Sequence, residues 1–210
     1  MAKLRERAIE LTSGGLTLEG ALHEGDGSLA AVMLHPHPQY GGDMHNHVVL
    51  GVCGAFAERH ASTLRFNFRG TGRSQGGFDG GRGETDDARA ALARMRALQP
   101  GVRTVLAGYS FGAVVAARAA QQEDLAGLVL ISPPAAMMAL PVLCAEVRTL
   151  LITGERDAIA PPASLEGYAS EAHRVVSVPD VDHGWWPGLD RLAAEVDAFI
   201  GGLIRDVAAG

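Results

Sequence analysis

The chain has 210 residues, of which 47% are hydrophobic, and its formal net charge at pH 7 is -6. This length and composition predict one domain that covers residues 1–210 and has its own apolar core. The negative charge argues against nucleic acid as a partner. No apolar run approaches the roughly 20 residues of a membrane span, so we expect no membrane association.

The first seven residues carry charges of both signs and no apolar stretch, so they do not resemble a secretory signal. The two cysteines, Cys53 and Cys144, lie far apart in the sequence, and neither is placed as a nucleophile would be. We therefore expect two reduced thiols in a cytoplasmic protein. The sequence leaves the oligomeric state open.

Two kinds of apolar pattern alternate along the chain. Alternating or β-branched runs predict strands, and amphipathic windows bounded by proline or glycine predict helices. The predicted strands cover residues 6–12, 16–24, 29–34, 62–68, 102–107, 127–132, 148–153 and 174–178. The predicted helices cover residues 46–59, 86–98, 113–120, 162–172 and 189–203, and residues 133–147 leave room for one short apolar helix.

The order of these elements predicts an α/β fold. Residues 6–12 and 16–24 are expected to form an antiparallel hairpin of two edge strands, joined at Gly14 and Gly15. The later strands alternate with helices. We therefore expect a mainly parallel central sheet of about eight strands with helices on both faces.

The pentapeptide Gly108-Tyr109-Ser110-Phe111-Gly112 lies between a predicted strand and a predicted helix. In this context G-x-S-x-G is typical of a nucleophile elbow, in which a tight turn exposes the serine hydroxyl. Such a turn tolerates only small residues beside the serine, because the strand and the helix pass close together. The motif alone also fits a tight connection whose serine caps the following helix.

An acid and a histidine follow the serine in chain order. Asp157 comes after predicted strand 148–153, and His183 comes after predicted strand 174–178. The order Ser, Asp, His is that of α/β hydrolases. Asp180 and Asp182 are nearer to His183 in sequence. Residues one or three positions away seldom reach an imidazole in line, so Asp182 is expected to face solvent or to bind loop backbone N–H groups.

The stretch HPHPQYGGDMHN at residues 35–46 is similar to the H-P-H-P-x-x-G-G-x-M-x-N signature of a subfamily of small, lidless bacterial serine hydrolases. The stretch RFNFRGTGRSQG at residues 65–76 is similar to the same subfamily. The resemblance extends from about residue 7 to residue 203. It implies an α/β-hydrolase fold without a lid domain, and it strengthens the reading of Ser110, His183 and Asp157 as a catalytic triad.

In that triad Ser110 attacks a carbonyl carbon, His183 transfers the proton and Asp157 orients the imidazole. An oxyanion hole needs two backbone N–H donors, and Phe111, the residue after the nucleophile, is expected to supply one. The other is expected from the loop at residues 35–39. Its two prolines have no N–H. By alignment with related loops the donor is His37, with Gln39 or Tyr40 as second choices.

The pocket walls are expected to come from apolar side chains, namely Tyr40, Phe111, Met137, Met138 and Trp185. An open, lidless cleft favours a small-molecule acyl substrate: a small ester, thioester or amide, with short-chain carboxylesters preferred. The alternative is a ligand-binding or scaffold protein of the same fold with little turnover.

Several potential metal ligands cluster in the chain, namely His35, His37, Asp43, His45 and His47. An H-x-H pair can bind Zn²⁺ in other folds. Here the first pair brackets a proline, and the loop is expected to begin with a histidine that makes structural hydrogen bonds. We therefore expect no metal and no cofactor.

Overall fold

The structure is a computed structural model that describes residues 4–209. One eight-stranded sheet runs through it, with strands in the order β1-β2-β4-β3-β5-β6-β7-β8. The strands are β1 (Glu6–Ser13), β2 (Leu16–His23), β3 (Leu29–Leu34), β4 (Ser62–Phe66), β5 (Arg103–Tyr109), β6 (Gly127–Ile131), β7 (Thr149–Gly154) and β8 (His173–Val178). The main helices are α1 (His47–Glu58), α2 (Arg82–Leu98), α3 (Phe111–Ala119) and α4 (Leu189–Ala209).

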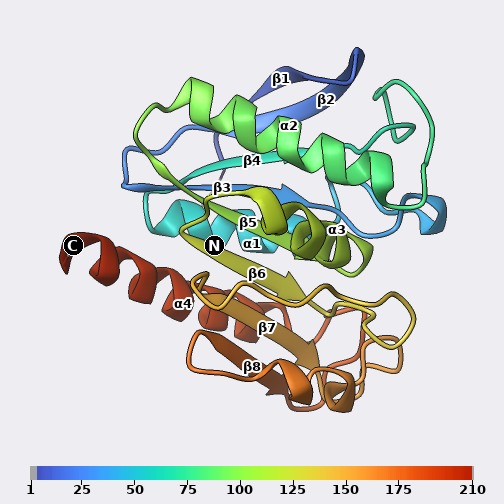
Figure 1. The fold of residues 1–210 in the computed structure, drawn as a ribbon, viewed down its shortest axis with the longest axis vertical. Helices are drawn as coiled ribbons and strands as arrows, with labels where there is room; N and C mark the ends of the chain where they lie inside the picture. The colour runs from blue at the N-terminus through green and yellow to red at the C-terminus, as the bar shows by residue number, and fades with distance from the viewer. Residues whose placement is uncertain (1–3, 210) are drawn as a thin grey trace.

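The sheet is antiparallel at one edge and parallel elsewhere. β1 pairs antiparallel with β2, and β2 pairs antiparallel with β4, whereas every later pairing is parallel. Helices α2 and α3 cover one face, and α1 and α4 cover the other (Figure 1). This is the predicted α/β-hydrolase fold, with its N-terminal hairpin.

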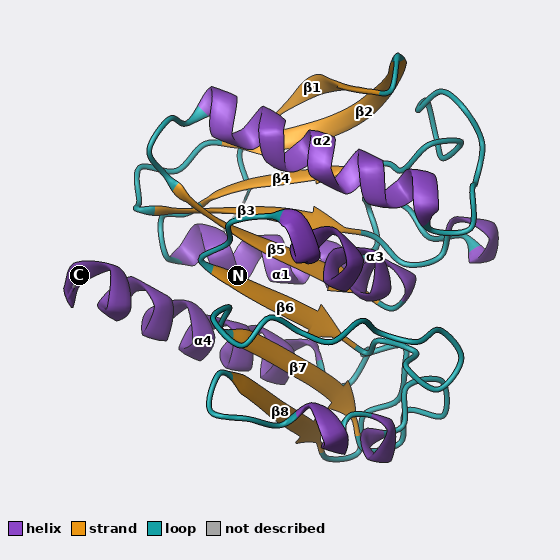
Figure 2. Cartoon of the chain, in the orientation of Figure 1, coloured by secondary structure: helices purple, strands orange, loops and turns teal. Residues whose placement is uncertain are grey.

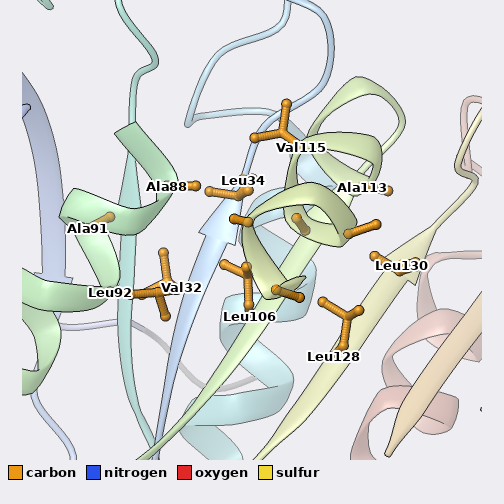
Figure 3. Close-up of a cluster of buried hydrophobic side chains, with 14 of the residues drawn as sticks. Val32, Leu34, Ala88, Ala91, Leu92, Leu106, Ala113, Val115, Leu128 and Leu130 are labelled. Carbon is orange, nitrogen blue, oxygen red and sulfur yellow. The ribbon is translucent and has the colours of Figure 1, made fainter. Parts of the chain in front are cut away.

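Each face of the sheet carries its own apolar core, and the central strands contribute side chains to both cores. Val32 and Leu34 of β3 point toward α2 and α3, together with Leu106 of β5 (Figure 3). Ala31 and Met33, the alternate residues of β3, join the cluster beneath α1 and α4. A continuous apolar run is therefore what a parallel strand buried on both faces requires.

Three details differ from the prediction. Only β1 is a sheet edge on this side, because β2 is paired on both of its sides. The predicted helix 162–172 is instead two 3-10 turns, η3 (Pro162–Ser164) and η4 (Glu166–Tyr168). The segment 133–147 forms turns and irregular chain rather than a short helix. Segment 133–147 holds Pro133, Pro134 and Pro141, and proline lacks the N–H that a helix interior needs. In segment 162–172 the glycine at position 167 disfavours a continuous helix.

The loops that follow β5, β7 and β8 emerge at the carboxyl ends of parallel strands, so they meet at one end of the sheet (Figure 2). Ligand sites of open α/β sheets lie at this end. No lid covers it in the described residues, since the connection from β6 to β7 holds no helix.

Candidate active site

The turn at Ser110 is strained. Ser110 has φ 54° and ψ -119°, a left-handed backbone conformation that L side chains rarely adopt. A Cβ on Gly108 would lie 2.2 Å from the carbonyl oxygen of Gly112, and a Cβ on Gly112 would lie 2.5 Å from that of His35. Both glycines are therefore required by close backbone approach. Such strain is typical of functional turns.

Ser110, His183 and Asp157 form one hydrogen-bonded chain. The Oγ of Ser110 lies 3.0 Å from the Nε2 of His183, and the Nδ1 of His183 lies 2.9 Å from an Asp157 carboxylate oxygen. With Nδ1–H donating to Asp157, Nε2 is left to accept the serine proton. The structure thus joins the three residues that the sequence singled out, each from the loop after a different strand.

Asp157 is buried, and its carboxylate is surrounded by donors. Burial alone raises the pKa of a carboxyl group, but hydrogen bonds from His183, from the N–H of Ala160 and from Ser132 outweigh it, so the pKa of Asp157 is lowered. The backbone N–H groups of Ile159 and Ala160 donate to Oδ1 at 2.9 and 2.7 Å. Asp157 is thereby held as an anion facing the imidazole.

The two competing acids are occupied elsewhere. The Oδ1 of Asp182 accepts the N–H of Gly184 at 3.0 Å, which is the local loop contact that was expected. Asp180 is exposed and forms an ion pair of 2.6 Å with Arg156. In the structure, the imidazole of His183 contacts the carboxylate of Asp157.

The two predicted oxyanion donors lie beside Ser110 in the same cavity. Phe111 is the first residue of α3, so its N–H has no acceptor within the helix. The second choices are used locally: the N–H of Gln39 donates to His37 Nδ1, and the N–H of Tyr40 donates to the His37 carbonyl. Among the described residues, the N–H of His37 has no such acceptor.

A cavity of about 450 Å³ opens at Ser110 and His183. Apolar side chains form most of its wall, including Tyr40, Phe111, Met137 and Met138 as expected. Tyr40 and Met137 are 87% and 77% exposed, so they stand at the mouth of the cavity. In the described part of the chain, no Asp, Glu, Lys or Arg lines it.

Trp185 was expected in this wall, and that prediction is wrong. Its side chain is fully buried in the core beneath α1 and α4, and its indole N–H donates to the hydroxyl of Ser132 at 2.9 Å. The reason is the backbone: Trp185 has φ 61°, which turns its side chain away from the direction that an ordinary loop residue would give it. The neighbouring Trp186 is the exposed one.

The histidines of residues 35–47 serve separate local structures. His35 is buried between the N–H of Phe68 and the carbonyl of Pro36. His47 bonds through Nε2 to the carbonyl of Gly184 at 2.7 Å, and its ring stacks on Trp186. Within residues 4–209, no three His, Cys, Asp or Glu side chains are grouped as a metal site would require.

Sequence reasoning missed two further contributors. The hydroxyl of Tyr109 donates to the carbonyl of His183 at 2.6 Å, which ties the histidine loop to the elbow. Asn46 lines the cavity from the start of α1. The position of Tyr109 inside the pentapeptide was a usable signal for the first, whereas nothing local in the sequence indicates the second.

Comparisons with known proteins agree with this geometry. A family model described as "Serine aminopeptidase, S33" matches residues 40–146. The lidless α/β serine hydrolase XC6422 of Xanthomonas campestris is 31% identical, with a TM-score of 0.82 and 94% of each chain covered. ATU1826 of Agrobacterium tumefaciens, a protein of unknown function, is 30% identical with a TM-score of 0.86, over 93% of this chain and 95% of that one.

A curated relative, the uncharacterized protein RP471 of Rickettsia prowazekii (strain Madrid E), is 41% identical over 106 residues. That match spans half of this chain and 44% of the relative. Fold and comparisons together define a hydrolase of the α/β class. The chain belongs to the α/β-hydrolase superfamily and, within it, to the family described as serine aminopeptidase, S33. Within residues 4–209, no helix has the length and hydropathy to span a bilayer.

Proposed function

We propose that the protein is a serine hydrolase that cleaves small, uncharged esters through an acyl-enzyme on Ser110. The observation that carries the proposal is the chain Ser110–His183–Asp157, set on a strained elbow at the wall of an apolar cavity. In acylation Ser110 Oγ attacks the ester carbonyl carbon while His183 Nε2 accepts its proton. The tetrahedral intermediate then collapses, and the alcohol leaves with that proton.

Deacylation repeats these steps with water. His183 removes a proton from a water molecule, which attacks the acyl carbon, and Ser110 leaves with the proton returned to its oxygen. Asp157 stays ionised throughout and stabilises the imidazolium. The backbone N–H groups of Phe111 and His37 are assigned to the oxyanion. One such donor lowers the activation barrier by about 3 kcal/mol.

The charge of the cleft favours esters over peptides with a free amino terminus. An aminopeptidase must hold the ammonium group of its substrate, and a buried ammonium needs a carboxylate or several acceptor oxygens. No acidic residue lines this cavity in the described part of the chain. The nearby Glu84 is fully buried and already accepts the N–H groups of Asp79 and Gly81. The family description therefore gives the fold and the class rather than the substrate.

The test combines labelling with turnover. A fluorophosphonate probe is expected to label the wild-type protein on Ser110, and 4-nitrophenyl acetate is expected to be hydrolysed. Ser110→Ala abolishes labelling and lowers kcat by a factor on the order of 10⁴ or more. The matched control is Ser177→Ala, at an exposed serine of β8, which is expected to keep both the labelling and the turnover. A folded wild-type protein that neither reacts with the probe nor turns over any ester would instead be a binding protein of this fold.

A further inference from the structure

Asn46 presents a fixed hydrogen-bond donor at the cavity. Its side chain caps α1, with Oδ1 accepting the N–H of Val48 at 2.9 Å. That bond identifies the oxygen, because the amide nitrogen cannot accept it. The two N–H bonds of Nδ2 are therefore the polar function that remains. Among the described residues Nδ2 has no hydrogen-bond partner. It is also not one of the buried polar atoms that lack a partner, so it is exposed to solvent.

The position of Asn46 places this donor near the reacting groups. Asn46 lines the same cavity as Ser110 and His183. Its neighbour His47 is bonded through Nε2 to the carbonyl of Gly184, the residue after His183. The start of α1 and the histidine loop are thus held together, so Asn46 stands on the His183 side of the cavity.

His37 offers a donor of the same kind. Its Nδ1 accepts the N–H of Gln39 at 3.2 Å, which leaves the ring proton on Nε2. Burial lowers the pKa of His37, against an opposing effect of Glu84, so the ring is neutral at pH 7. In both side chains a local backbone N–H occupies the acceptor atom. Asn46 and His37 therefore each present a side-chain N–H donor to the cleft.

We propose that Asn46 is a specificity-determining residue, whose Nδ2 donates to an acceptor oxygen of the substrate other than the scissile carbonyl. The preferred substrates are short, uncharged esters that carry an ether, keto or similar oxygen beyond the reacting group. Substrates that bring an ammonium group to this position instead meet the donor of Asn46 and, among the described lining residues, no carboxylate, so they are disfavoured. This inference rests on the proposed ester hydrolysis.

The test uses pairs of esters that differ by one atom. In 4-nitrophenyl methoxyacetate an oxygen replaces one CH₂ of 4-nitrophenyl butyrate, so size is matched on the acyl side. In 2-methoxyethyl butyrate an oxygen replaces one CH₂ of butyl butyrate, so size is matched on the alcohol side. The quantity measured is the ratio of kcat/KM within each pair. Comparing that ratio between protein variants cancels the different intrinsic reactivity of the two esters.

Two variants separate the donor from the cap. Asn46→Ser and Asn46→Asp both keep a side-chain oxygen for the N–H of Val48, since Ser and Asp are good N-cap residues. Neither keeps the amide donor. Thermal unfolding verifies that both variants fold. Because Asn46→Asp also adds an acceptor, it is expected to raise the relative rate on glycine ethyl ester against ethyl propionate.

In Asn46→Ser the preference for the oxygen-bearing ester is expected to fall about three- to tenfold in at least one pair, the value of one neutral hydrogen bond. A purely capping role predicts equal changes for both members of each pair, and unchanged ratios in both pairs would overturn the inference. Failure of the underlying proposal looks different: wild-type protein would then hydrolyse none of the four esters and would not react with a fluorophosphonate probe.

Discussion

The indole N–H of Trp185 donates a 2.9 Å hydrogen bond to the hydroxyl of Ser132, and both side chains are fully buried. An indole nitrogen can only donate, so the Ser132 oxygen accepts and its own proton must point elsewhere. It points to Asp157. Burial raises the pKa of that carboxyl group, and hydrogen bonds from His183, Ala160 and, to a smaller extent, Ser132 lower it. Ser132 itself has φ 44°, a strained conformation at the end of β6. A buried tryptophan thus orients a hydroxyl toward the candidate catalytic acid.

Trp185→Phe tests this arrangement. The substitution keeps most of the aromatic volume but removes the N–H, so the Ser132 hydroxyl is free to rotate away from Asp157. We expect kcat to fall about three- to tenfold, the value of one hydrogen bond. An Asp157 carboxylate that has lost a donor stabilises the imidazolium more strongly, so the acid limb of the kcat/KM profile, which reports protonation of the catalytic base, should move to higher pH.

The matched control is Trp186→Phe. Trp186 is 76% exposed and stacks on His47 without contacting Ser132, so its substitution should leave the acid limb in place. Rates and a pH profile like those of the wild type in a folded Trp185→Phe protein would show that Ser132 needs no fixed orientation.

Asp157 and Asp182 are distinguished by their amide variants. Asp157→Asn keeps an oxygen for the N–H groups of Ile159 and Ala160 but no longer fixes the imidazole tautomer or stabilises its cation. A loss in kcat on the order of 10⁴ is expected. Asp182→Asn retains an oxygen for the N–H of Gly184 and should change kcat less than about twofold, as is usual for surface substitutions. If Asp182→Asn were the more damaging change, the acid would have to be reassigned.

His35 makes stability depend on pH. Its neutral ring donates from Nδ1 to the Pro36 carbonyl and accepts the Phe68 N–H at Nε2, so a proton on Nε2 would face another donor. Burial lowers the pKa of His35 from 6.5 to about 4. Because the folded pKa is the lower one, this stabilisation is complete above pH 6.5 and is lost as the pH falls toward 4. The loss amounts to about 3 kcal/mol of unfolding free energy.

The measurement is urea unfolding of wild type and His35→Gln at pH 7 and at pH 4. Glutamine keeps an acceptor for Phe68 but does not titrate, so the free-energy difference between the two proteins should shrink at the lower pH. His60→Gln, at an exposed histidine, serves as the control and should follow the wild type. Parallel pH dependences for wild type and His35→Gln would contradict the prediction.

How far the sequence predicted the molecule depended on whether the signal was local. The strands, the amphipathic helix α2 and the elbow at Ser110 were predictable, because periodicity and turn chemistry act over a few residues. The side-chain direction of Trp185 was not predictable, since it depends on a positive φ that the neighbouring residue types do not indicate. The donor at Asn46 depends on a helix cap and on a contact between segments 137 residues apart in sequence.

The last prediction concerns acyl chain length. The cavity has about 450 Å³ and is open at its mouth, where Met137 is largely exposed. Each CH₂ buried against its apolar wall contributes about 0.8 kcal/mol, which is about a fourfold gain in kcat/KM per added carbon. The gain ends where the chain passes Met137 and reaches water. We therefore expect a maximum at short 4-nitrophenyl esters in a series from acetate to palmitate.

Two controls sharpen that series. Met138→Ala removes apolar wall inside the cavity, so it should reduce the gain per carbon among the short esters, whereas Val142→Ala, at an exposed valine that does not line the cavity, should not. With no lid to open, the rate should show no jump when the substrate passes from monomers to emulsion droplets. A maximum at palmitate, or such a jump, would mean that segment 133–147 or a partner chain builds a deeper acyl site than this open cavity provides.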